Sequence, residues 1–257
     1  MARKFQFFGS YSSLDVDAQA FITATGITDA TQITAVNNLV LGLKSNNIWI
    51  KIKAIYPFVG GTATTHKFNL KNPLDTDAAY RLSFIGGWTH SVNGALPNGT
   101  NAYADTFLNN NILAQNSNHI SGYSRTNSST PSTIIASWNS VFGTSIYPRQ
   151  YGFFYVNNNS TSQSTVLNTD SRGFFLNTRR SATEILFQKN SNQNIILNTS
   201  TTYITASFKI SRTGDSNSEY SNRELALISI GDGLTNTESS NFYTTVQAFQ
   251  TALSRQV

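Results

Sequence analysis

Histidines are the side chains of this sequence best suited to metal binding or acid–base catalysis, and there are three of them. His66, His90 and His119 lie far apart and show none of the short spacings of a metal-binding motif. The chain has no cysteine, which excludes thiolate ligands and disulfides. The sequence therefore predicts neither a metal site nor a bound cofactor.

Carboxylates give no better case for catalysis. A glycosidase needs two of them at a fixed separation, one of which is desolvated. The glutamates of this chain stand apart from one another in sequence, at Glu184, Glu219, Glu224 and Glu238. The sequence also lacks a nucleophile elbow and a phosphate-binding glycine-rich loop. The segment with Asn98, Asn101 and Asp105 carries too little negative charge for calcium. We predict that the protein is not an enzyme.

Aromatic residues in loop-rich segments are the remaining candidates for a binding site. In the segment Gly-Gly-Trp-Thr-His-Ser, two glycines allow a close approach of the backbone, and the tryptophan offers a ring for stacking. Sugar sites combine such a ring with hydrogen-bonding side chains. The same aromatic residues can instead fill a β-sandwich core, which is the role we predict for Trp49. The candidate ligand-binding residues are Trp88, His90, Tyr103, Tyr123 and Trp138.

The strongest strand signal lies between Asn46 and Thr62. Over residues 48–55, isoleucines alternate with Trp49, Lys51 and Lys53, and a period of two places the two sets on opposite faces of a sheet. Pro57 cannot donate a hydrogen bond to a strand neighbour and should end this strand. The sequence therefore predicts a half-buried strand over residues 48–55.

Two short helices are predicted ahead of this strand, so we divide the chain into an N-terminal segment, residues 1–45, and a sandwich domain, residues 46–257. The first helix covers residues 15–25 and stops at Gly26. The second takes Thr28 as its N-cap. We expect both to pack on the outside of the sheet, or alternatively to act as a docking element. The apolar face of the second helix consists of Ile33, Val36, Leu39, Val40 and Leu43.

An aromatic cluster precedes these helices. Phe5, Phe7 and Phe8 either form a first strand or insert into a neighbouring molecule.

After Thr62, short apolar runs alternate with clusters of Gly, Asn, Ser and Pro, which is typical of a sandwich or jelly roll. The clearest hairpin has the polar turn Lys-Asn-Ser-Asn-Gln, residues 189–193, between two apolar arms. The predicted strands are residues 66–70, 80–85, 107–113, 120–124, 133–138, 152–156, 173–176, 183–188, 194–198, 203–210 and 224–230.

A terminal helix follows the last predicted strand. Thr235 or Thr237 can cap it, and we expect it to cover one end of the sandwich. Its apolar face consists of Phe242, Val246, Phe249 and Leu253.

Charge and hydropathy limit the classes of partner that the sequence predicts. The net charge is +5, but the basic residues are scattered and form no stripe interleaved with aromatic residues. No apolar stretch is long enough to span a membrane, and the first residues do not form a secretion signal. We therefore predict no nucleic-acid partner and no membrane insertion.

The end of the chain resembles laminin-G-like, concanavalin A-like domains. In those domains a Leu-Ser/Thr-x-x-Glu segment starts a short helix after the final strand, and residues 234–238 read Leu-Thr-Asn-Thr-Glu. The hairpin at residues 186–197 is also similar, although it has Asn-Ser-Asn-Gln where those domains usually carry Asn-Gly. The resemblance implies a mainly β fold, a jelly-roll β-sandwich with two short N-terminal helices and one C-terminal helix.

Residues 15–44, 49–73 and 86–107 resemble a module of tailed-bacteriophage proteins, including crAss-like ones. This resemblance implies a structural protein of the virion, either a capsid decoration or head fibre or a tail appendage. Its partners would be other virion proteins and further copies of itself, as a trimer. Residues 114–181 match least, and we expect host-facing specificity there. The alternative function is that of a lectin-like adhesin that binds a host-surface glycan.

Overall fold

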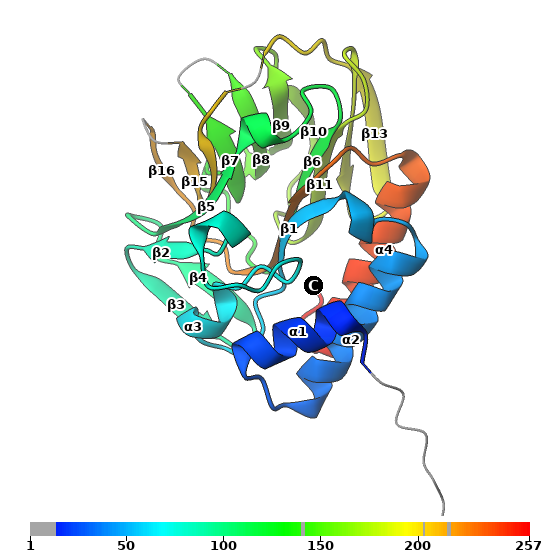
Figure 1. The fold of residues 1–257 in the computed structure, drawn as a ribbon. Coiled ribbons are helices and arrows are strands. Elements are labelled where there is room, and N and C mark those ends of the chain that lie inside the picture. Colours follow the sequence, from blue (N-terminus) through cyan, green and yellow to red (C-terminus); the bar gives the residue numbers. More distant parts are fainter. Residues whose placement is uncertain (1–13, 140–141, 203, 215–216) are drawn as a thin grey trace, which may run out of the picture.

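The computed structural model describes residues 14–139, 142–202, 204–214 and 217–257. It shows two antiparallel sheets packed face to face, with helices on the outside of one of them (Figure 1). The predicted mainly β sandwich is confirmed. Phe5, Phe7 and Phe8 lie outside the described residues.

Sheet A is built around β17 (Leu225–Gly231), a strand from near the end of the chain. One edge of β17 pairs with β6, and two short strands, β4 and β1, share its other edge. In sheet order, the other members are β13 (Asn192–Leu197), β12 (Glu184–Lys189), β11 (Gly173–Arg179), β6 (Asn118–Ser124), then β4 (Gly94–Pro97) with β3 (Trp88–Ser91), and β1 (Ile52–Tyr56).

Sheet B lies against the inner face of sheet A. Its edge strands are β10 and β2, and a small hairpin, β15 with β16, follows β14. The order is β10 (Ser164–Leu167), β9 (Phe153–Ser160), β8 (Gly143–Gln150), β7 (Ile135–Trp138), β14 (Ser207–Ile210), β5 (Tyr103–Asn109) and β2 (Ser83–Ile85), with the hairpin strands at Arg212–Gly214 and Asn217–Tyr220.

Helices cover the outer face of sheet A. They are α1 (Val16–Thr25), α2 (Ala30–Ser45) and α4 (Asn236–Ala252), while α3 (Ala63–His66) and the 3₁₀ turns at Trp49–Lys51, Asp77–Ala79 and Asn110–Ile112 lie in connections. None of the described helices is long and apolar enough to cross a membrane.

The molecule has two hydrophobic layers. One fills the space between the sheets and includes Phe154, Phe175 and Ile228. The other lies between sheet A and the helices, where Phe174 of β11 meets Phe242 of α4 with ring centroids 5.4 Å apart. Both predicted N-terminal helices thus pack on the outside of a sheet. The terminal helix covers the face of sheet A, and the prediction that it covers one end of the sandwich is wrong.

Helix caps follow from short polar side chains. Thr235 and Glu238 form the capping box that starts α4, and Gly26 ends α1 in the left-handed conformation. The N-cap of α2 is Asp29 and not the predicted Thr28. The Asp29 carboxylate accepts a hydrogen bond from the Gln32 N–H at 2.8 Å, which satisfies an otherwise unpaired donor of the first turn.

The strand predicted over residues 48–55 starts four residues late. Residues Trp49–Lys51 form a 3₁₀ turn, in which the Lys51 N–H donates to the Ile48 carbonyl at 2.9 Å. The turn buries Ile48 and Trp49 together and leaves Ile50 74% exposed, so the alternation fails there. Trp49 is a core residue, as predicted.

Other predicted strands shift or change type. Residues 63–66 form α3, and a loop follows where a strand over residues 66–70 was predicted. The predicted hairpin at residues 183–198 exists, but its turn is only Asn190-Ser191, because Lys189 still pairs with Asn192. The strand predicted over residues 107–113 is instead the end of β5, which begins at Tyr103, followed by the 3₁₀ turn at Asn110–Ile112. Strands β3, β4, β8, β10, β15 and β16 were not predicted, since their polar or glycine-rich sequences lack a run of apolar residues.

Candidate functional site

The fold brings two of the three histidines together. His66 Nδ1 and His90 Nδ1 lie 2.9 Å apart, so one ring donates a hydrogen bond to the other. Burial, His90 and Arg255 together lower the pKa of His66 to about 3, and burial lowers the pKa of His90. Both rings are therefore neutral near pH 7. Among the described residues, no group of three or more His, Cys, Asp or Glu side chains is placed to hold a metal ion.

Trp88 belongs to the same cluster. Its indole N–H donates to the carbonyl oxygens of Ile85 at 3.1 Å and Tyr103 at 3.2 Å. The half-buried ring contacts Phe84 edge-on and stacks on His90, with centroids 6.1 Å apart. The only polar group of the indole is thus already bonded within the protein.

The close approach expected at Gly86 and Gly87 is to the protein's own loop at residues 98–101. A Cβ at Gly86 would lie 2.3 Å from the Asn101 carbonyl oxygen, and one at Gly87 would lie 2.5 Å from Asn98 Nδ2. Gly86 also has a φ of +78°, which favours glycine. The glycine pair therefore serves local packing.

The other predicted site residues are partly or fully covered. Arg212 lies over the Tyr103 ring, 4.8 Å from its centroid. Tyr123 is fully buried beneath α4, and its hydroxyl donates to Gln247 Oε1 at 3.2 Å. Tyr123 therefore offers no ring to a ligand, contrary to the prediction, because the outer face of sheet A is a second core here. Trp138 is half-buried at the end of β7.

The sheet register separates Trp138 from the cluster. Ile210 of β14 pairs with Ile135 of β7 on one side and with Ala104 of β5 on the other, so Ile135 lies level with the neighbour of Tyr103. Trp138 lies three residues further along β7, at the opposite end of the strand. The structure thus brings Trp88, His90 and Tyr103 together, and it places Tyr123 and Trp138 elsewhere.

A different group of large side chains lies on the outer face of sheet B, where Tyr151, Phe153 and Leu167 are exposed and Tyr155 is partly buried. We call Tyr151, Phe153, Tyr155 and Leu167 the Tyr151 patch. Phe154 and Val156 point into the core between the sheets, so the alternation of β9 turns Phe153 and Tyr155 outward. Their ring centroids are 6.1 Å apart.

The β8–β9 turn presents the patch. Tyr151 and Gly152 form the two-residue turn, with φ values of +50° and +87°. Tyr151 is 78% exposed at the tip, and Leu167 of the edge strand β10, opposite Phe153, is 71% exposed. A side chain so large and exposed contributes little to the core, which leaves it available for binding.

Polar groups without partners lie on the same turn. Arg149 Nε and Gln150 Oε1 are buried, and the structure gives them no hydrogen-bond partner. Such buried atoms ordinarily bond to an ordered water. Arg149 also points Nη1 toward Asn127 Oδ1 at 3.5 Å. Aromatic rings, a guanidinium and amides are the functional groups that bind sugars.

A hairpin covers the neighbouring part of sheet B. Glu219 of β16 accepts hydrogen bonds from the Tyr147 hydroxyl at 2.9 Å and the Thr213 hydroxyl at 2.7 Å. Burial raises the pKa of Tyr147 well above its usual range. The hairpin is thereby anchored on β8.

The glutamates do not gather into a catalytic pair. Each is bonded to a different partner: Glu184 to Arg180, Glu219 to Tyr147, Glu224 to Arg125 and Glu238 to Lys51. The absence of catalysis nevertheless stays a prediction.

Sequence reasoning missed the Tyr151 patch. The run Phe153-Phe154-Tyr155-Val156 resembles a strand buried on both faces, for which no surface role is expected. The Tyr-Gly pair before it was the available signal for a tight turn with an exposed aromatic tip.

Comparison with known proteins supports the fold assignment. No protein-family model matches the chain, and no curated protein matches it in sequence. Among solved structures, domain 4 of the GH43 extracellular arabinanase AbnA from Geobacillus stearothermophilus, in complex with arabinotriose, matches with a TM-score of 0.50 and 11% identity, over 75% of this chain and 98% of that one. The chain has the β-sandwich fold of such binding domains.

Two further matches are parts of longer chains. One is a structure of botulinum neurotoxin type C, a toxin whose cell entry depends on interaction with two ganglioside molecules. It matches with a TM-score of 0.51 and 15% identity, over 79% of this chain and 53% of that one. A mutant of Trypanosoma rangeli sialidase that displays trans-sialidase activity matches with a TM-score of 0.52 and 9% identity, over 84% and 39%. This chain spans about half or less of these two proteins.

Proposed function

We propose that the protein binds carbohydrate through the Tyr151 patch, as a lectin-like module without catalytic activity. The observation that carries this proposal is the cluster of exposed Tyr151 and Phe153 with partly buried Tyr155 on sheet B, the sheet that α1, α2 and α4 leave uncovered (Figure 1). The patch replaces the predicted set around Trp88, whose polar groups are bonded within the protein.

The chemistry of the patch suits an oligosaccharide. Phe153 and Tyr155 offer ring faces for the C–H groups of a sugar, and Gln150, which pairs with Phe153 across the turn, carries an amide next to them. The arabinotriose and ganglioside named for the two structural neighbours support this class of ligand. Because the patch extends over the β8–β9 turn and strands β9 and β10, we expect contact with two or more sugar units.

Binding to a glycan array that includes arabino-oligosaccharides and ganglioside glycans tests the proposal. A Tyr151→Ala, Phe153→Ala double variant should bind at least about tenfold more weakly, as expected when stacking aromatic rings are lost. Its melting temperature should change little because both side chains are exposed. The matched control is Leu197→Ala, an 85% exposed apolar residue on edge strand β13, which should bind as the parent does.

Two results would refute the site. One is unchanged glycan binding by the folded double variant, and the other is the absence of binding to any glycan on the array. If a Trp88→Ala, Trp138→Ala variant loses binding while the Tyr151 and Phe153 variant keeps it, the site lies with the tryptophans.

The virion role is untouched by these comparisons and stays a prediction. It is compatible with glycan binding, since a particle appendage can carry a host-recognition module. Detection of the protein in purified phage particles by mass spectrometry would test it. Its absence from such particles would exclude the role.

A further inference from the structure

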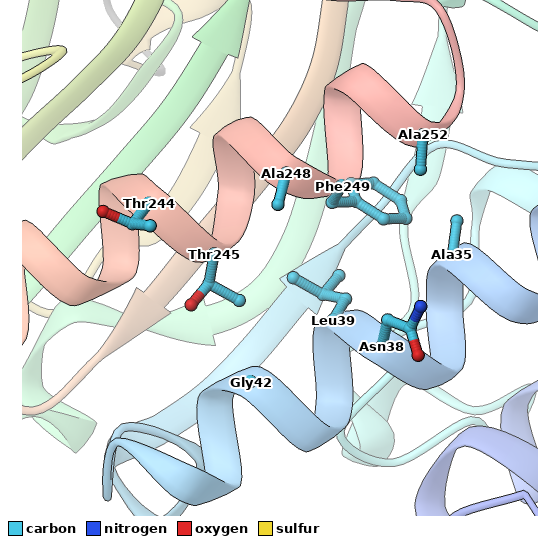
Figure 2. Close-up of a pocket in the computed structure, with 9 residues that line it drawn as sticks. All are labelled: Ala35, Asn38, Leu39, Gly42, Thr244, Thr245, Ala248, Phe249 and Ala252. Carbon is cyan, nitrogen blue, oxygen red and sulfur yellow. The ribbon is translucent and has the colours of Figure 1, made fainter.

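The outward face of α2 and α4 has an open groove. The helices come closest at Gly42, where a Cβ would lie only 2.8 Å from Thr245 Cγ2. Beyond this crossing, small side chains leave a hollow of about 270 Å³ between the helices, with Leu39 and Phe249 at its base (Figure 2). A second hollow, at Ala30, Thr34 and Ala252, continues it along the two helices.

This face carries no charge. Lys44 is the only charged residue within α2, and it turns toward α1 to pair with Asp15 at 2.7 Å and Asp17 at 2.6 Å. Glu238 is the only charged residue within α4, and it pairs with Lys51 at 2.6 Å. The outward residues between them are alanine, glycine, serine, threonine, asparagine and one leucine. Depletion of charge is the composition expected at the centre of an interface.

The leucine is Leu41, and it is 46% exposed. It lies one helical turn from Asn38, which lines the groove, so Leu41 stands on the outward ridge of α2 next to it. The face therefore presents an apolar side chain directly beside an apolar hollow, a ridge next to its own groove.

We infer that two copies of the protein associate through the α2–α4 face, with Leu41 of each copy seated in the groove of the other. In a two-fold contact the same patch meets itself, so a charged patch would oppose like charges. The α2–α4 face meets itself without a direct contact between like charges, since Lys44 and Glu238 are paired elsewhere. Because ridge and groove share one face, a single two-fold contact fills both grooves.

The face is small for a protein interface. The helices have 16 and 17 residues. At about 1.5 Å per residue and about 10 Å in diameter, they present a face of roughly 25 by 20 Å, or about 500 Å² per copy. A pair would bury about 1,000 Å² in total, which is near the lower bound for a specific interface, so the association should be weak and reversible.

The pairing is independent of the proposed function. The α2–α4 face covers sheet A, and the Tyr151 patch lies on sheet B, so both patches of the pair stay exposed. A pair would present two patches to one surface or to two. A cyclic trimer, as predicted from the phage resemblance, joins two different faces of each copy, whereas the ridge and the groove here share one face.

Sedimentation equilibrium of the full chain, from about 5 to 200 µM, tests the inference. The parent should be a reversible monomer and dimer, and Leu41→Glu should weaken the dimer at least about tenfold because it buries a charge in each groove. Leu74→Glu, a change at a 60% exposed leucine outside these helices, is the matched control and should leave the dimer intact.

Cysteine cross-linking gives a second test, since the chain has no cysteine of its own. An oxidised mixture of Leu41→Cys and Ala248→Cys proteins should form a disulfide-linked pair, and a Thr100→Cys protein should not cross-link with either. A monomeric parent, a trimer, or a dimer that survives Leu41→Glu would overturn the inference. So would a dimer that is lost only when residues 1–13 are deleted.

Discussion

Lowering the pH from 8 to 5 should destabilise the fold, because its histidines are buried as neutral rings. His119 is the clearest case. Its side chain is fully buried, with Nδ1 2.6 Å from the Asp232 carbonyl oxygen and Nε2 3.2 Å from Ser229 Oγ. The carbonyl can only accept, so Nδ1 carries a proton, and in the neutral ring Nε2 accepts a hydrogen bond from the Ser229 hydroxyl.

The size of the effect follows from the pKa values. Burial, partly offset by the Asp232 carbonyl, lowers the pKa of His119 from 6.5 to about 4 in the folded state. The folded pKa lies below the unfolded one, so the unfolded state takes up a proton first as the pH falls. The contribution is fully present above pH 6.5 and is lost progressively toward pH 4. At pH 5, His119 alone accounts for about 2 kcal/mol of lost stability relative to pH 8.

His66 adds a loss of similar size, about 2 kcal/mol at pH 5, because its folded pKa is about 3. Carboxylates contribute little to the change in stability between pH 8 and pH 5, since unfolded Asp and Glu titrate at about pH 4.

Urea unfolding at pH 8 and pH 5 measures the effect. With an m-value of about 3 kcal/mol per molar, each histidine should lower the midpoint by roughly 0.7 M between the two pH values. The variant His119→Asn, whose amide can still donate to the Asp232 carbonyl, should lose about half of the combined pH dependence of His66 and His119, whatever its stability at pH 8. A parent midpoint that is equal at pH 8 and pH 5, or a His119→Asn variant with the full pH dependence, would refute the reasoning.

Two further substitutions test the packing. Arg255 is fully buried and donates to the carbonyl oxygens of Phe58 at 2.8 Å and Pro57 at 3.1 Å. Because Arg255→Leu leaves these acceptors unpaired, it should lower the free energy of unfolding, measured in urea, by about 3 kcal/mol or more. An unchanged urea midpoint would contradict this. Gly231→Ala should lower the free energy of unfolding by at least about 2 kcal/mol, because its Cβ would lie 2.2 Å from the Lys51 carbonyl oxygen, where β1 meets β17. At Gly152 an added Cβ meets no atom within 4 Å. If Gly231→Ala loses less stability than Gly152→Ala, the predicted clash is excluded.

Local sequence signals were sufficient for the helices. The N-cap and apolar spacing of α4 appear in its sequence, and Thr235, Phe242 and Val246 take the predicted roles. The same reasoning failed at Ile50, since the two-residue period of a strand cannot show that a 3₁₀ turn will bury two consecutive residues.

The candidate site was harder to predict because exposure is a property of the assembled layers. Tyr123 and Tyr155 both alternate along strands, but α4 covers one and no helix covers the other. His66 and His90 meet although 24 positions separate them, which no spacing rule detects. The sequence therefore supports the fold class, and pairing across sheets decides which aromatic side chains remain on the surface.

The position of β17 has a consequence for how the chain folds during synthesis. This strand joins β6 to β4 and β1, yet it is made after nearly all of the strands it organises. A ribosome-bound chain that ends before Leu225 holds β6 with an unpaired edge, and Phe174 without the helix that covers it. Contacts between residues so distant in sequence form slowly and leave such edges prone to aggregation. Sheet A can therefore close only once the last strand and α4 have emerged, and until then the edge of β6 and the ring of Phe174 stay uncovered.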